Sequence, residues 1–103
     1  MQSNKPYLVI TPQATHELQN IAQWYEEKAP YLGDRFLEAV NESLKKILES
    51  PTAFAYHKTT KLRRYILPHF PYRIFYLIDG TRIKVIDVIH TSRSKKYIRR
   101  RLR

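Results

Sequence analysis

Cysteine is absent from this chain of 103 residues, and glycine occurs only twice. The lack of cysteine excludes disulfide bonds, thiolate metal sites and cysteine nucleophiles, and it fits a reducing compartment. Because Gly33 and Gly80 are the only glycines, the chain cannot form a glycine-rich phosphate-binding loop. No apolar run approaches the ~18 residues of a membrane span, and the first residues do not resemble a signal peptide. We therefore expect a cytoplasmic protein with no membrane partner.

Acidic side chains are scarce in the second half of the chain. Residues 51–103 contain fourteen lysines and arginines against two acidic residues, whereas residues 1–50 contain five against seven. The formal net charge of +10 therefore comes from the second half alone. Such a field attracts phosphate backbones or acidic protein segments at salt-dependent rates. This asymmetry favours a polyanionic partner over a role in solubility alone.

The length allows one domain, residues 1–103, with one modest hydrophobic core. The last residues, from about 94 to 103, form a strongly basic tail. This tail has three possible states: a short helix, a frayed end, or a segment that is ordered by a partner. The chain contains no internal repeat and no linker.

Two amphipathic helices are predicted in the first half. Thr11 followed by Pro12 is a strong helix start. The threonine hydroxyl can accept a hydrogen bond from an unpaired backbone N–H of the first turn, and proline has no N–H group that would be left unpaired. The apolar stripe that follows ends near Ala29-Pro30, and a second stripe runs from Phe36 to the break at Ser50-Pro51. A short connection between them predicts an antiparallel helical hairpin. Trp24 lies beside the first stripe, and we expect it to pack in the core.

The second half has the two-residue period of strands. Residues 61–67, 72–78 and 82–90 are rich in β-branched and aromatic side chains and predict a three-stranded antiparallel meander, which residues 7–10 would join as a fourth strand. The fold class is therefore α+β. A two-residue turn at Asp79-Gly80 would place Tyr76 opposite Ile83 and Ile74 opposite Val85. One face of the sheet would rest on the helical hairpin, and the other would stay partly open.

Several kinds of catalytic centre have no counterpart in the sequence. The four histidines, His16, His57, His69 and His90, do not have metal-ligand spacing, and no nucleophile elbow is present. Glu26 and Glu27 are neighbours on a helix and point apart, which indicates a solvated face rather than a catalytic carboxylate pair. We predict neither a metal nor a cofactor.

What remains is a basic surface with interspersed aromatic residues, mostly on the predicted strands. Guanidinium groups bind phosphate in bidentate fashion, and tyrosine or histidine can stack on bases. RNA cleavage by the substrate's own 2′-hydroxyl needs only a base, a cation and an acid, so such a set could act without a metal. From the residues alone, binding without chemistry is favoured. The set comprises Arg63, Arg64, Tyr65, Arg73, Lys84, His90, Arg93, Lys95, Lys96 and Tyr97.

The order of elements and four segments together resemble the RelE/ParE superfamily of toxins from type II toxin-antitoxin modules. These segments are ATHELQNIAQWYEE, GDRFLEAVNESLKKILESP, RRYILPHFPYRIFYLIDG and IKVIDVIHTSR. The resemblance spans Tyr7 to Tyr97, and FPYRIFY with the ending at His90 looks more like the ParE side. It implies a small cytoplasmic toxin that inhibits growth, acts in plasmid stabilisation, and is held inactive by a cognate antitoxin encoded by an adjacent gene.

The resemblance implies two alternative mechanisms. ParE-like members are described as poisoning DNA gyrase, whereas RelE-like members are endoribonucleases that cut mRNA on the ribosome. Two RelE arginines match Arg73 and Arg93, and the first of two RelE lysines falls on Arg64. The second falls on Ile66, which cannot transfer a proton, and the RelE tyrosine falls near Arg99, two residues from Tyr97.

We therefore expect a gyrase inhibitor without established chemistry of its own. An mRNA endoribonuclease and a non-toxic nucleic-acid-binding module are the alternatives. The candidate catalytic residues are Arg64, Arg73, His90, Arg93 and Tyr97. The candidate residues for binding the target, nucleic acid or antitoxin are Arg63, Arg64, Arg73, Lys84, Arg93, Lys95 and Lys96.

Overall fold

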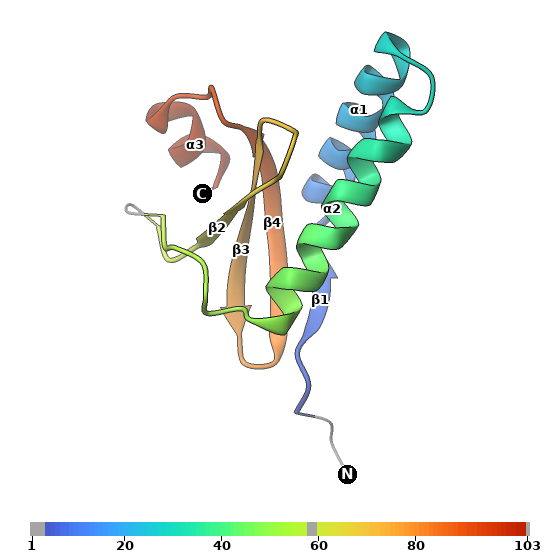
Figure 1. Cartoon of the computed structure of the whole chain (residues 1–103). Coiled ribbons are helices and arrows are strands. Elements are labelled where there is room, and N and C mark those ends of the chain that lie inside the picture. The colour runs from blue at the N-terminus through green and yellow to red at the C-terminus, as the bar shows by residue number, and fades with distance from the viewer. Residues whose placement is uncertain (1–3, 58–59, 103) are drawn as a thin grey trace.

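The computed structural model describes residues 4–57 and 60–102 and consists of a helical hairpin packed beside a four-stranded sheet (Figure 1). This arrangement confirms the α+β prediction. The sheet has the order β1-β4-β3-β2. Along the chain the elements are β1 (Tyr7–Ile10), α1 (Pro12–Lys28), α2 (Leu32–Glu49), β2 (Arg63–Ile66), β3 (Tyr72–Asp79), β4 (Arg82–His90) and α3 (Lys95–Arg101).

The start of α1 and the ends of both helices lie where the local sequence predicts, whereas α2 begins at Leu32, before the predicted stripe. The Thr11 hydroxyl accepts a hydrogen bond from the Ala14 N–H at 3.1 Å and starts α1. The start of α2 is capped from the other helix, because the Glu26 carboxylate accepts the N–H groups of Tyr31 at 2.9 Å and Gly33 at 3.1 Å. Glu26 is exposed, as predicted, and it also has this capping role, which the sequence analysis did not anticipate. A carboxylate at a helix N-terminus is favoured by the unpaired N–H groups there.

The sheet is mixed, because β1 pairs with β4 in parallel while the other strands are antiparallel. The predicted register of the β3–β4 hairpin was wrong: Tyr76 lies opposite Val85, and Ile74 lies opposite Val88. Asp79 pairs with Arg82, so the two linking residues are 80 and 81, one position later than predicted. A bulge in β4 shifts the pairing a second time, between Phe75 and Tyr76 of β3.

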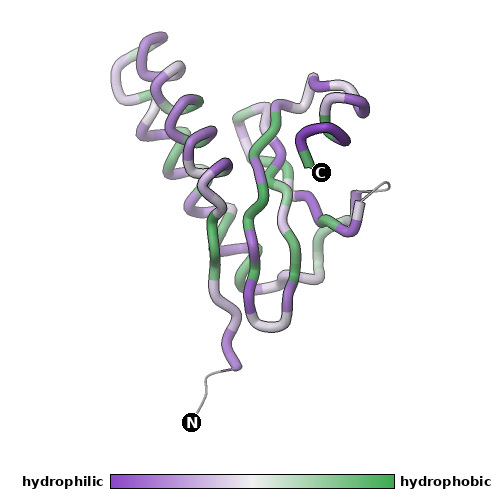
Figure 2. Tube along the Cα trace, turned by 180° about the vertical axis from the view of Figure 1, so that it is seen from behind, coloured by the Kyte–Doolittle hydropathy of each residue, from purple (hydrophilic) through white to green (hydrophobic). Residues whose placement is uncertain are grey.

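Apolar side chains are buried on both faces of the sheet. The main core lies between the sheet and the helical hairpin and includes Phe36, Ile47 and Tyr76. A second cluster on the opposite face contains Leu62, Phe75, Ile89 and Ile98. Ile98 belongs to α3, so this helix covers a face that we expected to stay partly open. In Figure 2 the strands carry most of the hydrophobic colouring, whereas α3 is largely hydrophilic.

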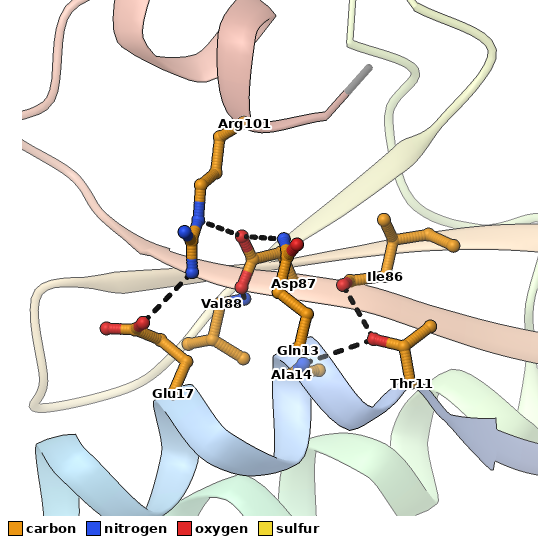
Figure 3. Close-up of polar contacts among 8 residues, drawn as sticks. All are labelled: Thr11, Gln13, Ala14, Glu17, Ile86, Asp87, Val88 and Arg101. Carbon is orange, nitrogen blue, oxygen red and sulfur yellow. Dashed lines mark hydrogen bonds and ion pairs between the residues drawn. The ribbon is translucent and has the colours of Figure 1, made fainter.

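A polar network joins α3 to the rest of the fold (Figure 3). The carboxylate of Asp87, on β4, is fully buried and accepts hydrogen bonds from Arg101 Nε at 2.7 Å and from Gln13 Nε2 at 2.8 Å. Arg101 also pairs with Glu17 of α1 at 3.0 Å. Of the three states considered for the basic tail, the structure therefore shows a short docked helix. Within the described residues, no helix is long and apolar enough to cross a membrane.

Candidate functional site

The predicted basic and aromatic residues divide between two regions instead of forming one surface. Arg64, Arg73 and Lys95 lie around His57 on the face of the sheet that α3 covers. His90 and Arg93 lie at the end of β4 and line a groove beside α1. We refer to these regions as the cation cluster and the aromatic groove.

The cation cluster is built on the register of β2 and β3. Arg64 pairs with Phe75 and Ile66 pairs with Arg73, so the two arginines are diagonal neighbours on one face. His57 packs edge-on against Phe75, with ring centroids 5.6 Å apart. Burial lowers the pKa of His57, and the positive charges of Arg64, Arg73 and Lys95 lower it further. The cluster therefore concentrates positive charge against a histidine that resists protonation.

The Nε atom of Arg73 is buried and has no hydrogen-bond partner among the described residues. The side chain directly opposite is Ile66, which is 58% exposed and offers neither a proton donor nor an acceptor. Arg73 can therefore attract an anion, but its cross-strand neighbour adds no acid or base.

Four other predicted residues lie outside both regions. The Arg63 guanidinium donates to the carbonyls of Thr52 at 3.2 Å and Phe54 at 2.8 Å and lies 4.0 Å above the Tyr56 ring. These contacts indicate that Arg63 holds the segment before β2. Lys84 lies opposite Leu77 near the hairpin turn, ~13 Å along β3 from the cation cluster at 3.3 Å per residue. Lys96 is exposed on α3, and Tyr65 packs against the main core.

The aromatic groove consists of two adjoining cavities of about 250 and 440 Å³. Both are lined by Glu17, Tyr72 and His90, so they form one continuous depression between α1 and the end of β4. Arg93 and Tyr97 close one end, and their side chains stack with the guanidinium 4.5 Å from the ring centroid. The Nδ1 atom of His90 accepts the Ser92 N–H at 3.0 Å, which fixes the imidazole orientation. Burial raises the pKa of the Tyr72 phenol.

Trp24 forms the other end of this groove and was missed by the sequence analysis. We predicted a core residue, but its side chain is 52% exposed and lines the second cavity. It lies one position before Tyr25, which does pack against the core, and that step turns it about 100° around the helix. Lys28 lies one turn further along, with Nζ 4.8 Å from the indole centroid.

The candidate catalytic residues do not all share one face of the sheet. Metal-independent RNA cleavage needs a general acid and a general base on either side of one bound phosphate. Here Arg73 lies opposite Ile89 and shares its face of the sheet, which α3 covers, whereas His90 lies opposite Tyr72 on the face of the helical hairpin. The catalytic candidates are thus not gathered around one point.

Comparison with known proteins identifies the family. Residues 8–95 match the family model described as the ParE toxin of the type II toxin-antitoxin system parDE. The chain belongs to the ParE toxin family. It is the toxin component of a type II toxin-antitoxin system. Among curated protein sequences, none matches this chain.

Solved structures with a similar fold include a chain of a chromosomal ParDE system and two RelE toxin chains. A chain of the chromosomal ParDE system from P. aeruginosa has a TM-score of 0.77 and 17% identity, covering 87% of this toxin and 100% of that chain. The isolated RelE toxin of E. coli has a TM-score of 0.60 and 19% identity, with 92% and 94% covered. A chain of the intact E. coli RelBE toxin-antitoxin complex has a TM-score of 0.59 and 21% identity, with 85% and 99% covered. At such identities the likeness shows the fold alone.

Proposed function

We propose that this ParE-family toxin stops growth by inhibiting DNA gyrase, and that it does so by binding rather than by cutting a substrate. The family match over residues 8–95 is the observation that carries the proposal. The separation of the cation cluster from the aromatic groove supports it. Ile66, opposite Arg73, falls where the RelE pattern has a lysine, and its side chain cannot transfer a proton. The loss of such a proton-transfer group typically lowers a reaction rate by about 10²-fold or more.

A cognate antitoxin encoded by an adjacent gene is the second part of the proposal. The ParDE and RelBE structures with this fold come from toxin-antitoxin systems. The basic second half of this chain suits an acidic partner segment. Co-expression of a small acidic reading frame beside this gene should restore growth and yield a complex that survives moderate salt.

RNA cleavage is the second candidate function, because one specific observation favours it. The buried Nε atom of Arg73 has no partner in the described part of the chain, and Arg64 and Lys95 lie near the same histidine. A phosphate bound there would supply an acceptor for that nitrogen. His90 or Tyr97 would then have to supply the acid, which requires movement from the groove.

One paired experiment separates the two functions. The toxin is induced in cells and mRNA ends are mapped by primer extension, while purified toxin is added to gyrase in a supercoiling assay. We expect loss of supercoiling activity without new codon-positioned mRNA ends. Arg93→Ala should weaken the inhibition by about tenfold or more, as expected for a lost charge-assisted contact. Arg35→Ala removes the same charge from an exposed site on α2 and serves as the matched control.

Each alternative function predicts a different result in this experiment. Prompt mRNA cleavage with intact gyrase activity would overturn the gyrase proposal in favour of the nuclease. Harmless overexpression combined with salt-dependent binding to any polyanion would instead indicate a non-toxic nucleic-acid-binding module. Circular dichroism of each variant confirms that a loss of inhibition is not a loss of fold.

A further inference from the structure

We propose that the outer face of α3 binds the phosphate backbone of duplex DNA, and that the toxin uses this face to hold the DNA on which gyrase acts. The link to gyrase rests on the proposed function, whereas the binding of DNA follows from the charge and the fixation of the helix. We call this surface the basic face, and it consists of Lys95, Lys96, Arg99 and Arg100.

The four cations of the basic face lie on one side of α3. Each residue turns an α-helix by about 100°, so the four positions fall within an arc of about 140°. Ile98 and Arg101 point to the opposite side, where Ile98 is buried and Arg101 bonds to Asp87. All four cations are exposed, and within residues 4–57 and 60–102 none of them pairs with a carboxylate. Their charges therefore project together into solvent.

The basic face is held in place by contacts on the inner side of α3. Arg101 joins the buried Asp87 of β4 to Glu17 of α1 (Figure 3). The apolar side chains of the helix pack against the second cluster of the sheet. Because these contacts all lie on the inner side, a ligand on the outer side does not have to displace any of them.

Acidic side chains are concentrated on the other side of the molecule. Seven of the nine acidic residues belong to α1 and α2, and α3 lies across the sheet from these two helices (Figure 1). The other two are neutralised, because Asp79 pairs with Arg82 at 2.6 Å and Asp87 pairs with Arg101 at 2.7 Å. This separation of charge attracts a polyanion to the side of α3 and orients it away from the helical hairpin.

The composition of the basic face suits phosphates better than a protein surface. A flexible acidic segment loses entropy when it is ordered, and apolar contacts must offset that loss. The basic face offers none, because Tyr97, Ile98 and Leu102 all pack inward, and the helix is largely hydrophilic in Figure 2. A phosphate backbone needs no apolar contact, since the release of its counterions drives binding.

The aromatic content of α3 favours a duplex over a single strand. Proteins that bind single strands add the stacking of bases on aromatic rings to the attraction between charges. The one aromatic residue of α3, Tyr97, packs against the second cluster, and the Arg93 guanidinium lies 4.5 Å from its ring centroid. The basic face thus has charge but no stacking platform. The outside of a duplex presents backbone charge without exposed base faces, which matches this surface.

The salt dependence of binding tests the proposal. A fluorescent duplex of about 20 base pairs is titrated with full-length toxin, and its anisotropy is measured at several salt concentrations. Four phosphate contacts predict that log Kobs falls with log[salt] with a slope of about −3.6. The double variant Lys96→Gln with Arg100→Gln should have a slope of about −1.8 and bind about tenfold or more weakly at ~0.1 M salt. The matched control, Arg35→Gln with Lys46→Gln on the exposed side of α2, should keep the slope of the parent.

Three results would refute the basic face as a DNA-binding surface. These are no change in anisotropy up to about 100 µM toxin at ~0.05 M salt, equal slopes for the parent and the α3 double variant, and equal losses in the two double variants. Competition identifies the ligand. Polyglutamate that displaces the duplex as readily as unlabelled duplex does would assign the face to an acidic protein, and tighter binding of oligothymidine would assign it to single strands.

A supercoiling assay with the same variants separates this proposal from the function on which it rests. The α3 double variant should need about tenfold or more toxin than the α2 control for equal inhibition of gyrase. Inhibition by the parent without duplex binding would refute the basic face and leave the gyrase function standing. Duplex binding without inhibition would do the reverse. Full inhibition by an α3 variant that no longer binds the duplex would refute the role of this face at gyrase.

Discussion

At the scale of single residues, Gly33 controls how closely the two helices approach. A Cβ atom at this position would lie 2.5 Å from the backbone oxygen of Ala22, which belongs to α1. The N–H of the same glycine is held at 3.1 Å by Glu26. Because both contacts come from α1, the start of α2 cannot move away from the clash without losing its cap. Neither contact can be predicted from a local sequence pattern, because each joins residues of different helices.

Gly33→Ala is therefore expected to destabilise the fold, although alanine is intrinsically the better helix former by about 1 kcal/mol. Overpacking against backbone atoms should outweigh that gain and lower the free energy of unfolding by about 1–3 kcal/mol in urea titrations. Gly80 provides the control, because its φ of +62° is left-handed and nothing lies within 4 Å of its Cβ position. Gly80→Asn should cost well below ~1 kcal/mol, since asparagine tolerates this conformation. A Gly33→Ala protein as stable as the parent would refute the steric account.

At the scale of elements, local signals predict the helices and strands well. Thr11-Pro12 and Ser50-Pro51 mark the helix ends because capping and the restriction before proline act within a few residues. The register of β3 and β4 was not predictable in the same way. The register depends on a bulge in β4 and on the packing of the sheet against α1 and α2, and both arise only in the assembled fold.

The docking of α3 is a similar case, and it explains why the tail could not be assigned from sequence. Arg101 bonds to Asp87 and to Glu17, which precedes it by 84 positions. A helix of seven residues is not stable on its own in water, so its order comes from these contacts and from buried Ile98. Most of α3 also lies beyond the residues that match the ParE family model, which end at position 95.

Replacing Arg101 should therefore loosen α3 without unfolding the sheet. Arg101→Gln leaves the fully buried Asp87 carboxylate without its cationic partner. It should lower the free energy of unfolding by about 1–3 kcal/mol. Hydrogen exchange should speed up for the amides of α3 while those of β3 stay protected. Arg100→Gln, on the exposed side of the same helix, should change neither quantity. Unaltered exchange in Arg101→Gln would show that Ile98 alone holds the helix.

At the scale of the whole molecule, tyrosines connect the helical hairpin, the sheet and the segment before β2. The Tyr76 side chain is fully buried, and its hydroxyl donates to the carbonyl of Pro51 at 2.7 Å. Burial raises the pKa of Tyr76 to about 12, against a smaller opposing effect of Arg63. Burial also raises the pKa values of Tyr25 and Tyr72. The folded state therefore favours neutral phenols, and the stability of the whole domain depends on their protonation.

This dependence predicts a specific loss of stability in alkali. Tyr76 ionises in the unfolded chain near its ordinary pKa of 10.0 but in the folded chain only at about 12. The contribution of the neutral Tyr76 phenol to stability is thus complete below about pH 10. It is lost as the pH rises to about 12, by roughly 2–3 kcal/mol at 1.36 kcal/mol per pKa unit.

Urea titrations of the parent, Tyr76→Phe and Tyr31→Phe from about pH 9 to about pH 12 measure this loss. The three proteins share every other ionisable group, so the differences between them isolate each phenol. Tyr76→Phe should be the less stable variant at about pH 9, where it lacks the bond to Pro51, and should lose less stability than the parent on the way to about pH 12. Tyr31→Phe, at a side chain that is 72% exposed, is the control for the loss of a tyrosine hydroxyl. The same slope for all three proteins would contradict the assignment of this loss to buried Tyr76.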